Sequence, residues 1–329
     1  MRAEEARSDI IHSHLTDQSA SWIYDPDVLM RDLTEFNITD EVLGSFAATA
    51  NGRLRTIMSS LIRHLHDFIR EVELTPAEWL EGIRFLTAIG RECTPERQEF
   101  ILLSDVLGLS TLVNVIQNGT SAGETPSSVL GPFFKEGVPQ VALGTSIVAK
   151  ETAPGQRVIV EGRVRDTSGS PIAGAEIVVW QASAEGHYDI QLLEGGELDY
   201  RGRFLSDADG RFFFRSVVPI GYAIPHDGPV GKMLDALGRH PNRPAHIHVL
   251  IRAAGYHELV TALYVAPDPY IESDTVFGVS RSLVVEVSPP SVDSAFPDLP
   301  RIVYDFRIAE ATATAARRTG VGADPATTG

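Results

Sequence analysis

The sequence predicts an α+β protein in which a helical N-terminal part precedes an antiparallel β-sandwich. Two observations on the spacing of apolar residues lead to this prediction. Up to about residue 130, apolar residues recur every three to four positions, which is typical of amphipathic helices. Beyond that point, short segments alternate between apolar and polar residues and are separated by Gly, Pro and Asp turns, which is typical of a sandwich. The 329 residues are enough for two domains.

These patterns divide the chain into four segments. We expect a flexible N-terminus over residues 1–24 and a helical domain over residues 25–130. A β-sandwich domain follows over residues 131–308, because the alternating segments end there. Residues 309–329 contain few large apolar side chains, so we expect a disordered tail.

The helices of the first domain are predicted from an apolar stripe and from capping signals. Residues 53–72 carry nine apolar residues at helical spacing. Thr75 and Glu78 form a capping box with Pro76 at the first helical position, so a second helix starts there. A further helix is expected from Thr94 and another near residues 27–46. The stripe residues are Leu54, Ile57, Met58, Leu61, Ile62, Leu65, Phe68, Ile69 and Val72.

The strands of the second domain are predicted from alternation and turn chemistry. Residues 156–166 alternate, and the turn sequence TSGSPIAG separates them from a second strand-like segment. The segment DADG supplies another turn before an aromatic strand. The expected strand regions lie within residues 156–166, 175–183, 207–219, 245–253, 259–266 and 282–289.

Composition excludes several classes of protein. The formal net charge of −16 argues against a nucleic-acid binder, which needs a basic face. The single Cys93 excludes an internal disulfide and a multi-cysteine metal site. No apolar run approaches the roughly 20 residues that span a bilayer, and the charged N-terminus lacks a signal-peptide core. We therefore expect a cytoplasmic protein without a membrane span.

Two His-x-His pairs are distinguished by the secondary structure beneath them. His64 and His66 lie in the helical stripe, where side chains two apart point about 200° apart and cannot share a ligand. His246 and His248 lie in a strand-like segment, where they share one face and are about 6.6 Å apart. A metal is therefore conceivable only at the second pair, although an isolated pair is more often two hydrogen-bonded side chains.

Two tyrosines are candidates for additional ligands. Tyr188 and Tyr222 lie close to glycines at strand ends next to irregular chain, where functional residues concentrate. A buried tyrosine with a hydrogen-bonded hydroxyl is an equally ordinary packing residue. Residue type and position alone leave both interpretations open.

Taken together, these segments resemble the intradiol ring-cleaving catechol dioxygenases, and most of all the hydroxyquinol 1,2-dioxygenases. The resemblance extends from about residue 25 to residue 308. Enzymes of this family contain a non-haem Fe(III) ion held by two tyrosines and two histidines. The matching stretches are residues 53–71, 97–113, 129–134, 162–189, 201–234, 238–256 and 272–279.

The resemblance implies a role for each residue of the candidate metal site. Tyr222 and His248 match the axial ligands of one Fe(III) per subunit, and Tyr188 and His246 match the equatorial ligands, which a solvent hydroxide completes. Phenolate and hydroxide favour Fe(III) because they are hard anionic donors. Tyr222 matches the ligand that leaves the metal when substrate binds and takes up a proton as the base. Arg243 matches an arginine that steadies the anionic substrate.

The resemblance also implies a substrate pocket. Asp105 stands in an otherwise apolar stretch, where we expect it to accept a hydrogen bond from the third hydroxyl of a trihydroxybenzene. Without the resemblance, an ordinary hydrogen bond within the helix would be the preferred interpretation of Asp105. The positions that match pocket residues of the family are Leu102, Asp105, Val129, Gly131, Pro132, Phe133, Ile224, Pro225 and Val276.

The predicted reaction is cleavage of hydroxyquinol (1,2,4-trihydroxybenzene) by O2 to maleylacetate by way of its enol form, 3-hydroxy-cis,cis-muconate. A small aromatic diol or triol and O2 are therefore the expected partners. Residues 25–130 are then a dimerisation domain of a homodimer, with a bound phospholipid as in other members, and residues 131–308 are the catalytic domain.

Three departures from the family pattern concern the substrate and not the reaction class. Ala262 replaces a glutamine of catechol-type members, Leu130 replaces an aromatic residue, and Val178 replaces an acidic residue. A catechol or chlorocatechol 1,2-dioxygenase is the nearest alternative. A non-catalytic β-sandwich binding module is an alternative of a different class. A zinc hydrolase is disfavoured because zinc prefers histidine, cysteine and carboxylate.

Overall fold

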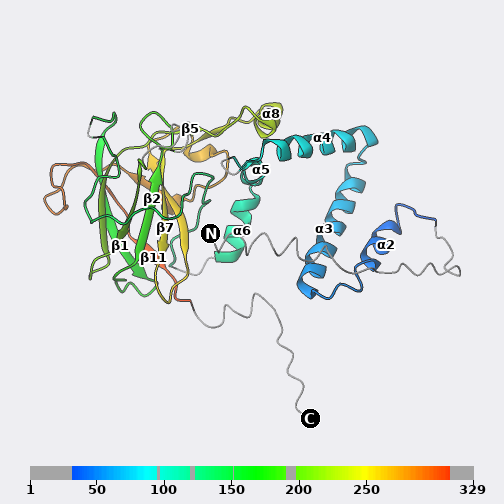
Figure 1. Cartoon of the computed structure of the whole chain (residues 1–329), viewed down its shortest axis with the longest axis horizontal. Helices are drawn as coiled ribbons and strands as arrows, with labels where there is room; N and C mark the ends of the chain where they lie inside the picture. The colour runs from blue at the N-terminus through cyan, green and yellow to red at the C-terminus, as the bar shows by residue number, and fades with distance from the viewer. Residues whose placement is uncertain (1–31, 95–96, 119–122, 151, 190–197, 312–329) are drawn as a thin grey trace, which may run out of the picture. The chain divides into compact units, whose positions relative to one another are not determined.

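The computed structural model describes residues 32–94, 97–118, 123–150, 152–189 and 198–311. The chain forms two compact units, Met1–Leu74 and Thr75–Gly329. The predicted flexible N-terminus, residues 1–24, lies outside the described residues, as does the predicted tail from residue 312 onward. A helical N-terminal region followed by a sheet-rich region confirms the predicted α+β class (Figure 1).

The first unit contains α2 (Ile38–Gly44) and α3 (Gly52–Glu71). Asn51 begins α3, since its side chain accepts a hydrogen bond from the Leu54 N–H at 3.0 Å. The Thr39 hydroxyl lies 3.0 Å from His66 Nδ1 and links the two helices. The predicted apolar stripe falls on α3 as expected, but most of its large side chains are 41–51 % exposed.

The second unit begins with three helices, α4 (Pro76–Glu92), α5 (Glu99–Val106) and α6 (Leu109–Asn118). The capping box that starts α4 is confirmed, because Thr75 and Glu78 exchange both hydrogen bonds. The single helix expected from Thr94 is instead two helices bent by 71°, because Gly108 adopts a positive φ of 73° after α5. In the described part of the chain, no single helix is long and apolar enough to cross a membrane, although α5 and α6 together reach those limits.

Two sheets form the sandwich (Figure 1). One sheet has the order β3-β2-β7-β8-β9; in the other, β1 pairs with β4, β10 and β11. The long pairings are antiparallel, as predicted, whereas the short β9, β10 and β11 pair in parallel. The strands are β1 (Arg157–Asp166), β2 (Glu176–Gln181), β3 (Arg201–Leu205), β4 (Arg211–Val217), β7 (His246–Arg252), β8 (Leu259–Ala266), β9 (Val284–Glu286), β10 (Arg301–Val303) and β11 (Phe306–Ile308).

A small ribbon and short helices complete the unit. The ribbon pairs β5 (Tyr222–Ala223) with β6 (Asn242–Arg243), and α8 (Pro229–Ala236) lies in the chain between them. Two 3-10 turns, Ile271–Ser273 and Arg281–Leu283, flank the segment that leads into β9.

Each strand of the central pair β2 and β7 is buried on both faces. The inward residues of β7, such as Ile247 and Val249, join the core between the sheets. Leu250 faces the other way and joins a second apolar cluster with Leu102 of α5 and Leu234 of α8. The outer face of the five-stranded sheet is therefore covered by helices, and burial on both faces explains the continuous apolar composition of these strands.

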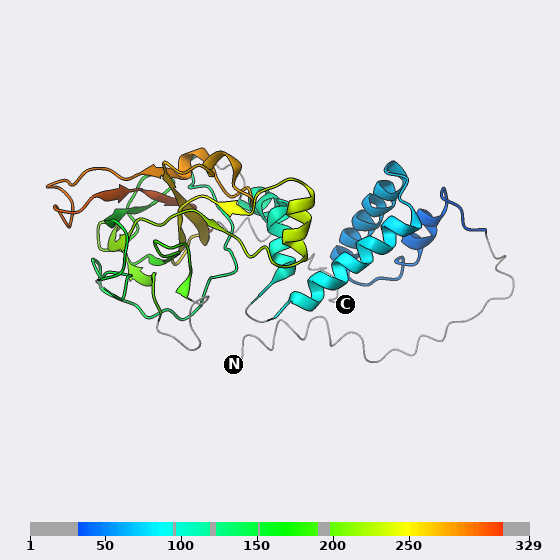
Figure 2. The same cartoon turned by 90° about the horizontal axis from the view of Figure 1, so that it is seen from above.

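The helix α8 is tied to α5 through a buried carboxylate. Glu99, which is 1 % exposed, accepts a hydrogen bond from the Val230 N–H at 3.2 Å near the start of α8. Arg97 bridges Glu99 and Asp227 with distances of 3.0 Å to each. The two helices consequently lie side by side (Figure 2), and the loop that precedes α8 is fixed against α5.

Candidate metal centre

Strand β7 places His246 and His248 on one face, as its period of two requires. Both side chains point away from the inter-sheet core, and both are 1 % exposed. His248 pairs across the sheet with Trp180 of β2, and the two rings stack 4.8 Å apart at an angle of 5°. The Trp180 ring therefore fixes the plane of the His248 imidazole.

Two irregular segments bring the tyrosines to the same face. Tyr188 follows the tight turn after β2 and is completely buried, with its ring stacked 4.4 Å from Phe133. Tyr222 begins β5, directly opposite Arg243 of β6. Gly186 has a positive φ of 82°, and a Cβ there would lie 3.2 Å from the Cβ of Tyr222. This glycine allows the turn to approach β5 closely.

The polar tips of the four side chains converge. The Nε2 atoms of His246 and His248 are 3.1 Å apart, and the Tyr188 hydroxyl lies 3.3 Å from His246 Nε2. The Tyr222 hydroxyl lies 3.4 Å from the Tyr188 hydroxyl. Two nitrogens and two oxygens thus face one another inside the protein, drawn from β7, β5 and the loop after β2.

The imidazoles are neutral and present lone pairs to this cluster. His246 Nδ1 donates to the Pro244 carbonyl at 2.7 Å, so its Nε2 carries no proton. Burial, and then the charge of Arg243, lower the pKa of His246 to about 3. Burial, followed by His246 and Arg243, lowers the pKa of His248 well below its ordinary value. Neutral imidazole is the form that binds metals.

The donor set fits a cation of high charge. Burial raises the pKa of the Tyr188 phenol well above 10, and burial likewise raises the pKa of Tyr222. Within the described residues, His248 Nδ1 has no hydrogen-bond partner, and no group of three or more His, Cys, Asp or Glu side chains is placed to hold a metal. A four-donor site therefore requires both phenol oxygens, which suit a hard ion such as Fe(III).

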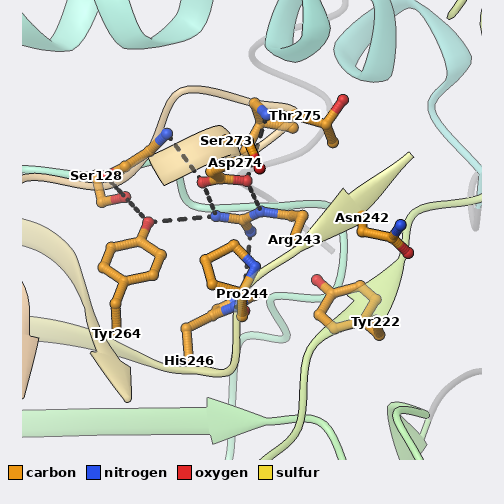
Figure 3. Close-up of polar contacts among 12 residues, drawn as sticks. Ser128, Tyr222, Asn242, Arg243, Pro244, His246, Tyr264, Ser273, Asp274 and Thr275 are labelled. Atoms are coloured by element: carbon orange, nitrogen blue, oxygen red, sulfur yellow. Dashed lines mark hydrogen bonds and ion pairs between the residues drawn. The ribbon is translucent and has the colours of Figure 1, made fainter. Parts of the chain in front are cut away.

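Arg243 lies beside the cluster and is held in a buried network (Figure 3). Its Nη1 lies 3.1 Å from His246 Nε2. Its positive charge favours the anionic form of the Tyr222 phenol and so opposes burial, which raises the pKa of that group. Its Nε and Nη2 donate to the two carboxylate oxygens of Asp274 at 3.1 and 3.2 Å. Its Nη2 also lies 3.3 Å from the Tyr264 hydroxyl.

Most residues that the resemblance assigns to a substrate pocket are buried near the four donors. Leu102, Val129, Phe133, Ile224 and Val276 form one apolar cluster with both tyrosines. Their part in substrate binding stays a prediction.

The remaining predicted pocket residues differ in their exposure. The positive φ of Gly131 is 74°, and a Cβ there would lie 3.4 Å from the His248 ring. Asp105 is 5 % exposed, and burial raises the pKa of its carboxyl group, opposed by a hydrogen bond to Ser110 and by the charge of Arg243. Pro132 is exposed and Pro225 half-buried.

Several residues of the site were not predicted from the sequence. Asp274 and Tyr264 contact Arg243, and a buried ion pair between Arg201 and Asp189 lies next to Tyr188 in the chain. In the sequence, the only local indication of this ion pair is the charged Asp189 directly after Tyr188, in the segment HYD. Partners this distant in sequence become recognisable only once the strands are paired.

The three departures from the family pattern are also located. Ala262 is fully buried opposite His248 on β8, so the position is adjacent to the site but carries no polar group. Val178 is buried on the outer face of β2, and Leu130 is 38 % exposed next to Gly131.

Comparisons with known proteins agree with this architecture. Residues 129–309 match the family described as Dioxygenase, and residues 51–125 match the catechol dioxygenase N terminus. The 6-chlorohydroxyquinol 1,2-dioxygenase of Cupriavidus pinatubonensis is 50% identical over 256 residues, which cover 78% of this chain and 92% of that protein.

Two solved structures are also similar. The hydroxyquinol 1,2-dioxygenase of Pseudomonas putida has a TM-score of 0.78 and 46% identity, covering 84% of this chain and 98% of that one. The catechol 1,2-dioxygenase of Pseudomonas arvilla has a TM-score of 0.70 and 29% identity, covering 84% and 92%. The family matches and the 50% identity over most of both chains show that this protein belongs to the intradiol ring-cleavage dioxygenases, of the hydroxyquinol type.

Proposed function

We propose that this protein cleaves hydroxyquinol with O2 between its two adjacent hydroxyl-bearing carbons, giving 3-hydroxy-cis,cis-muconate, the enol form of maleylacetate. The observation that carries the proposal is the convergence of two buried phenol oxygens and two neutral imidazole nitrogens, with neighbouring atoms 3.1–3.4 Å apart. The relatives named for hydroxyquinol and for 6-chlorohydroxyquinol support the choice of a trihydroxybenzene substrate over catechol.

Tyr188, Tyr222, His246 and His248 would hold one Fe(III) ion per subunit. The fit follows from the donor set, since hard phenolate oxygens favour the ferric ion and the histidines are neutral. Once bound there, a ferric ion would supply Lewis-acid activation of the substrate for its reaction with O2.

The side chains around the donors supply proton transfer and charge stabilisation. The Tyr222 oxygen takes a proton from a substrate hydroxyl. The charge of the nearby Arg243 guanidinium favours the anionic form of that oxygen. Arg243 also stabilises the anionic substrate, because its charge is permanent and its planar fork suits an oxyanion.

The apolar cluster around the donors orients the ring and excludes water. Phe133 supports Tyr188 by stacking, and Leu102, Ile224 and Val276 provide apolar walls. Asp105 is the polar exception in this wall, and it lies close enough to Arg243 for the two charges to interact. We assign Asp105 to the third hydroxyl of hydroxyquinol, the group that catechol lacks.

Oxygen consumption by the purified protein with hydroxyquinol, catechol and chlorinated catechols tests the function. We expect the highest kcat/KM for hydroxyquinol and a red to brown colour from tyrosinate-to-iron charge transfer. Removal of iron with a chelator should abolish both the colour and O2 consumption, and added iron should restore them. A colourless protein that retains no iron and consumes no O2 would support the binding-module alternative, and a preference for catechol would support the catechol-type alternative.

Chlorinated hydroxyquinol is a second candidate substrate. The relative named for 6-chlorohydroxyquinol is 50% identical, and Leu130 provides an aliphatic, partly exposed side chain beside Gly131. Comparing kcat/KM for hydroxyquinol and 6-chlorohydroxyquinol decides between them.

Replacement of Asp105 by alanine should lower the selectivity for hydroxyquinol over catechol. A hydrogen bond to a charged acceptor contributes about 1.5–3 kcal/mol, so the ratio of the two kcat/KM values should fall about 10- to 100-fold. Asp105→Asn keeps one acceptor oxygen and should lose less of the ratio. An unchanged ratio in Asp105→Ala would show that the carboxylate does not contact the third hydroxyl.

We also propose that residues 25–130 mediate homodimerisation, while residues 131–308 carry out catalysis. Exposed apolar side chains on α3, among them Leu61, Leu65 and Phe68, support this proposal, because such a stripe favours a covering partner. A phospholipid bound to this helical domain and a cytoplasmic location stay predictions. The mass of the protein in solution tests the dimer, and extraction with organic solvent tests the lipid.

A further inference from the structure

Arg243 is buried to an extent that requires a charge partner. Its side chain is 3 % exposed, and that of Asp274 is 2 % exposed. The two groups meet as a fork on a fork, with Nε on Oδ1 at 3.1 Å and Nη2 on Oδ2 at 3.2 Å. Such bidentate pairs fix the plane of the guanidinium as well as its position.

The carboxylate of Asp274 is itself held by the backbone. The Gly278 N–H donates to Oδ2 at 3.0 Å, and the Val276 N–H approaches Oδ1 at 3.4 Å. The carboxylate is therefore fixed by the segment between the two 3-10 turns, which leads into β9. The position of this segment consequently determines the position of the Arg243 guanidinium (Figure 3).

The Arg243 guanidinium also contacts Tyr264, which is in turn hydrogen-bonded to Ser128. The Tyr264 hydroxyl lies 3.3 Å from Arg243 Nη2 and 2.7 Å from the Ser128 hydroxyl, and Ser128 donates to the Gly278 carbonyl at 3.1 Å. Asp274 and Tyr264 together engage Nε and Nη2. Nη1 is the nitrogen that faces the donor cluster, 3.1 Å from His246 Nε2.

We propose that Asp274 is a positioning residue that orients Arg243, so that Nη1 faces the donor cluster, 3.1 Å from His246 Nε2, and the substrate oxygens that bind there. The inference deepens the proposed function, on which it rests. Asp274 touches neither the four donors nor the substrate in this assignment, so its whole contribution to catalysis passes through Arg243. A displacement of a catalytic group by about 1 Å can lower a rate on the order of 100-fold.

Replacement of Asp274 by asparagine tests this assignment. The amide keeps the shape of the side chain but places a second donor against the guanidinium, so we expect kcat for hydroxyquinol to fall about 100-fold, with iron content and the visible charge-transfer band retained. In an Arg243→Gln background, the same substitution should lower kcat by less than about 3-fold, because the residue on which Asp274 acts is already gone. An equal fall in both backgrounds, or loss of the charge-transfer band from a folded Asp274→Asn protein, would overturn the proposal.

Asp268→Asn serves as the matched control. Asp268 also accepts hydrogen bonds from backbone N–H groups, those of Ala245 at 3.0 Å and Tyr270 at 2.8 Å. Asp274, in contrast, is the carboxylate that pairs with the Arg243 guanidinium. We expect Asp268→Asn to lower kcat far less than Asp274→Asn; an equal loss would indicate general support of the loops and contradict positioning.

Asp274→Glu covers the case in which Asp274→Asn does not fold. It keeps the charge but moves the carboxylate by one methylene, so the protein should retain iron while kcat falls at least about 10-fold. Unchanged kcat in this variant would overturn the proposal. Absence of O2 consumption by the wild-type protein would instead refute the proposed function, so the two failures are distinguishable.

Discussion

Replacement of Tyr188 by phenylalanine is expected to deplete the protein of iron and to lower kcat for ring cleavage by more than about 10³-fold. The hydroxyl of Tyr188 lies between His246 Nε2 and the Tyr222 hydroxyl, at 3.3 and 3.4 Å. Without it, the site keeps three donors and loses one of the two anionic oxygens that select Fe(III). Metal analysis, the visible spectrum and O2 consumption measure the effect.

The phenylalanine variant should fold, which makes the loss specific to the hydroxyl. The ring of residue 188 is fully buried and stacks on Phe133, and phenylalanine preserves that contact. Tyr256→Phe is the matched control, because Tyr256 lies in the turn between β7 and β8. This turn follows the C-terminal end of β7, whereas His246 lies at its N-terminal end. The control should retain iron and activity. A Tyr188→Phe protein with full iron content and unchanged colour would remove Tyr188 from the ligand set.

The part of the site that the sequence could predict from geometry alone is the histidine pair. A period of two forces His246 and His248 onto one face of β7, and the same reasoning separates them from His64 and His66 on helix α3. The capping box of α4 was likewise readable, because it depends on residues three positions apart.

The tyrosines could not be assigned by periodicity, because both lie where the chain leaves regular structure. Their convergence depends on the β5–β6 ribbon, which has two residues in each strand, and on the tight turn at Gly186. Only the family resemblance connected them to the histidines. The contact between Asp274 and Arg243 spans 31 residues of sequence, so no local pattern indicates it.

Departures in the fold have similar physical origins. The helix expected from Thr94 breaks because Gly108 takes a left-handed conformation that an apolar period does not reveal. The strands β9, β10 and β11 have three residues each, and all three pair in parallel. The predicted strand region at 282–289 contains β9 but does not give the direction of its pairing, and β10 and β11 are too short to show alternation. Short strands of this kind are positioned by the sheet that they join.

Replacement of Asp189 by asparagine is expected to destabilise the iron-free protein by about 3–5 kcal/mol. The Arg201 and Asp189 side chains are 2 % and 3 % exposed, and they form a bidentate pair. Arg201 also donates to the Phe133 carbonyl at 3.2 Å, which links the pair to the ring that supports Tyr188. The substitution leaves a buried cation without its countercharge, since water cannot readily solvate it there.

Urea denaturation of the iron-free protein measures this loss of stability, and an exposed ion pair provides the comparison. Glu81→Gln removes the partner of Arg84, where both side chains are more than 60 % exposed, and should cost less than about 1 kcal/mol. The double variant Asp189→Leu/Arg201→Met should recover much of the stability lost in Asp189→Asn, because no buried charge is left unpaired. If Asp189→Asn were no more destabilising than Glu81→Gln, the buried pair would not hold the Tyr188 segment in place. In that case, any loss of iron from Asp189→Asn would need another explanation. If the variant is unstable as expected, loss of iron follows because Asp189 is the residue directly after Tyr188 in the chain.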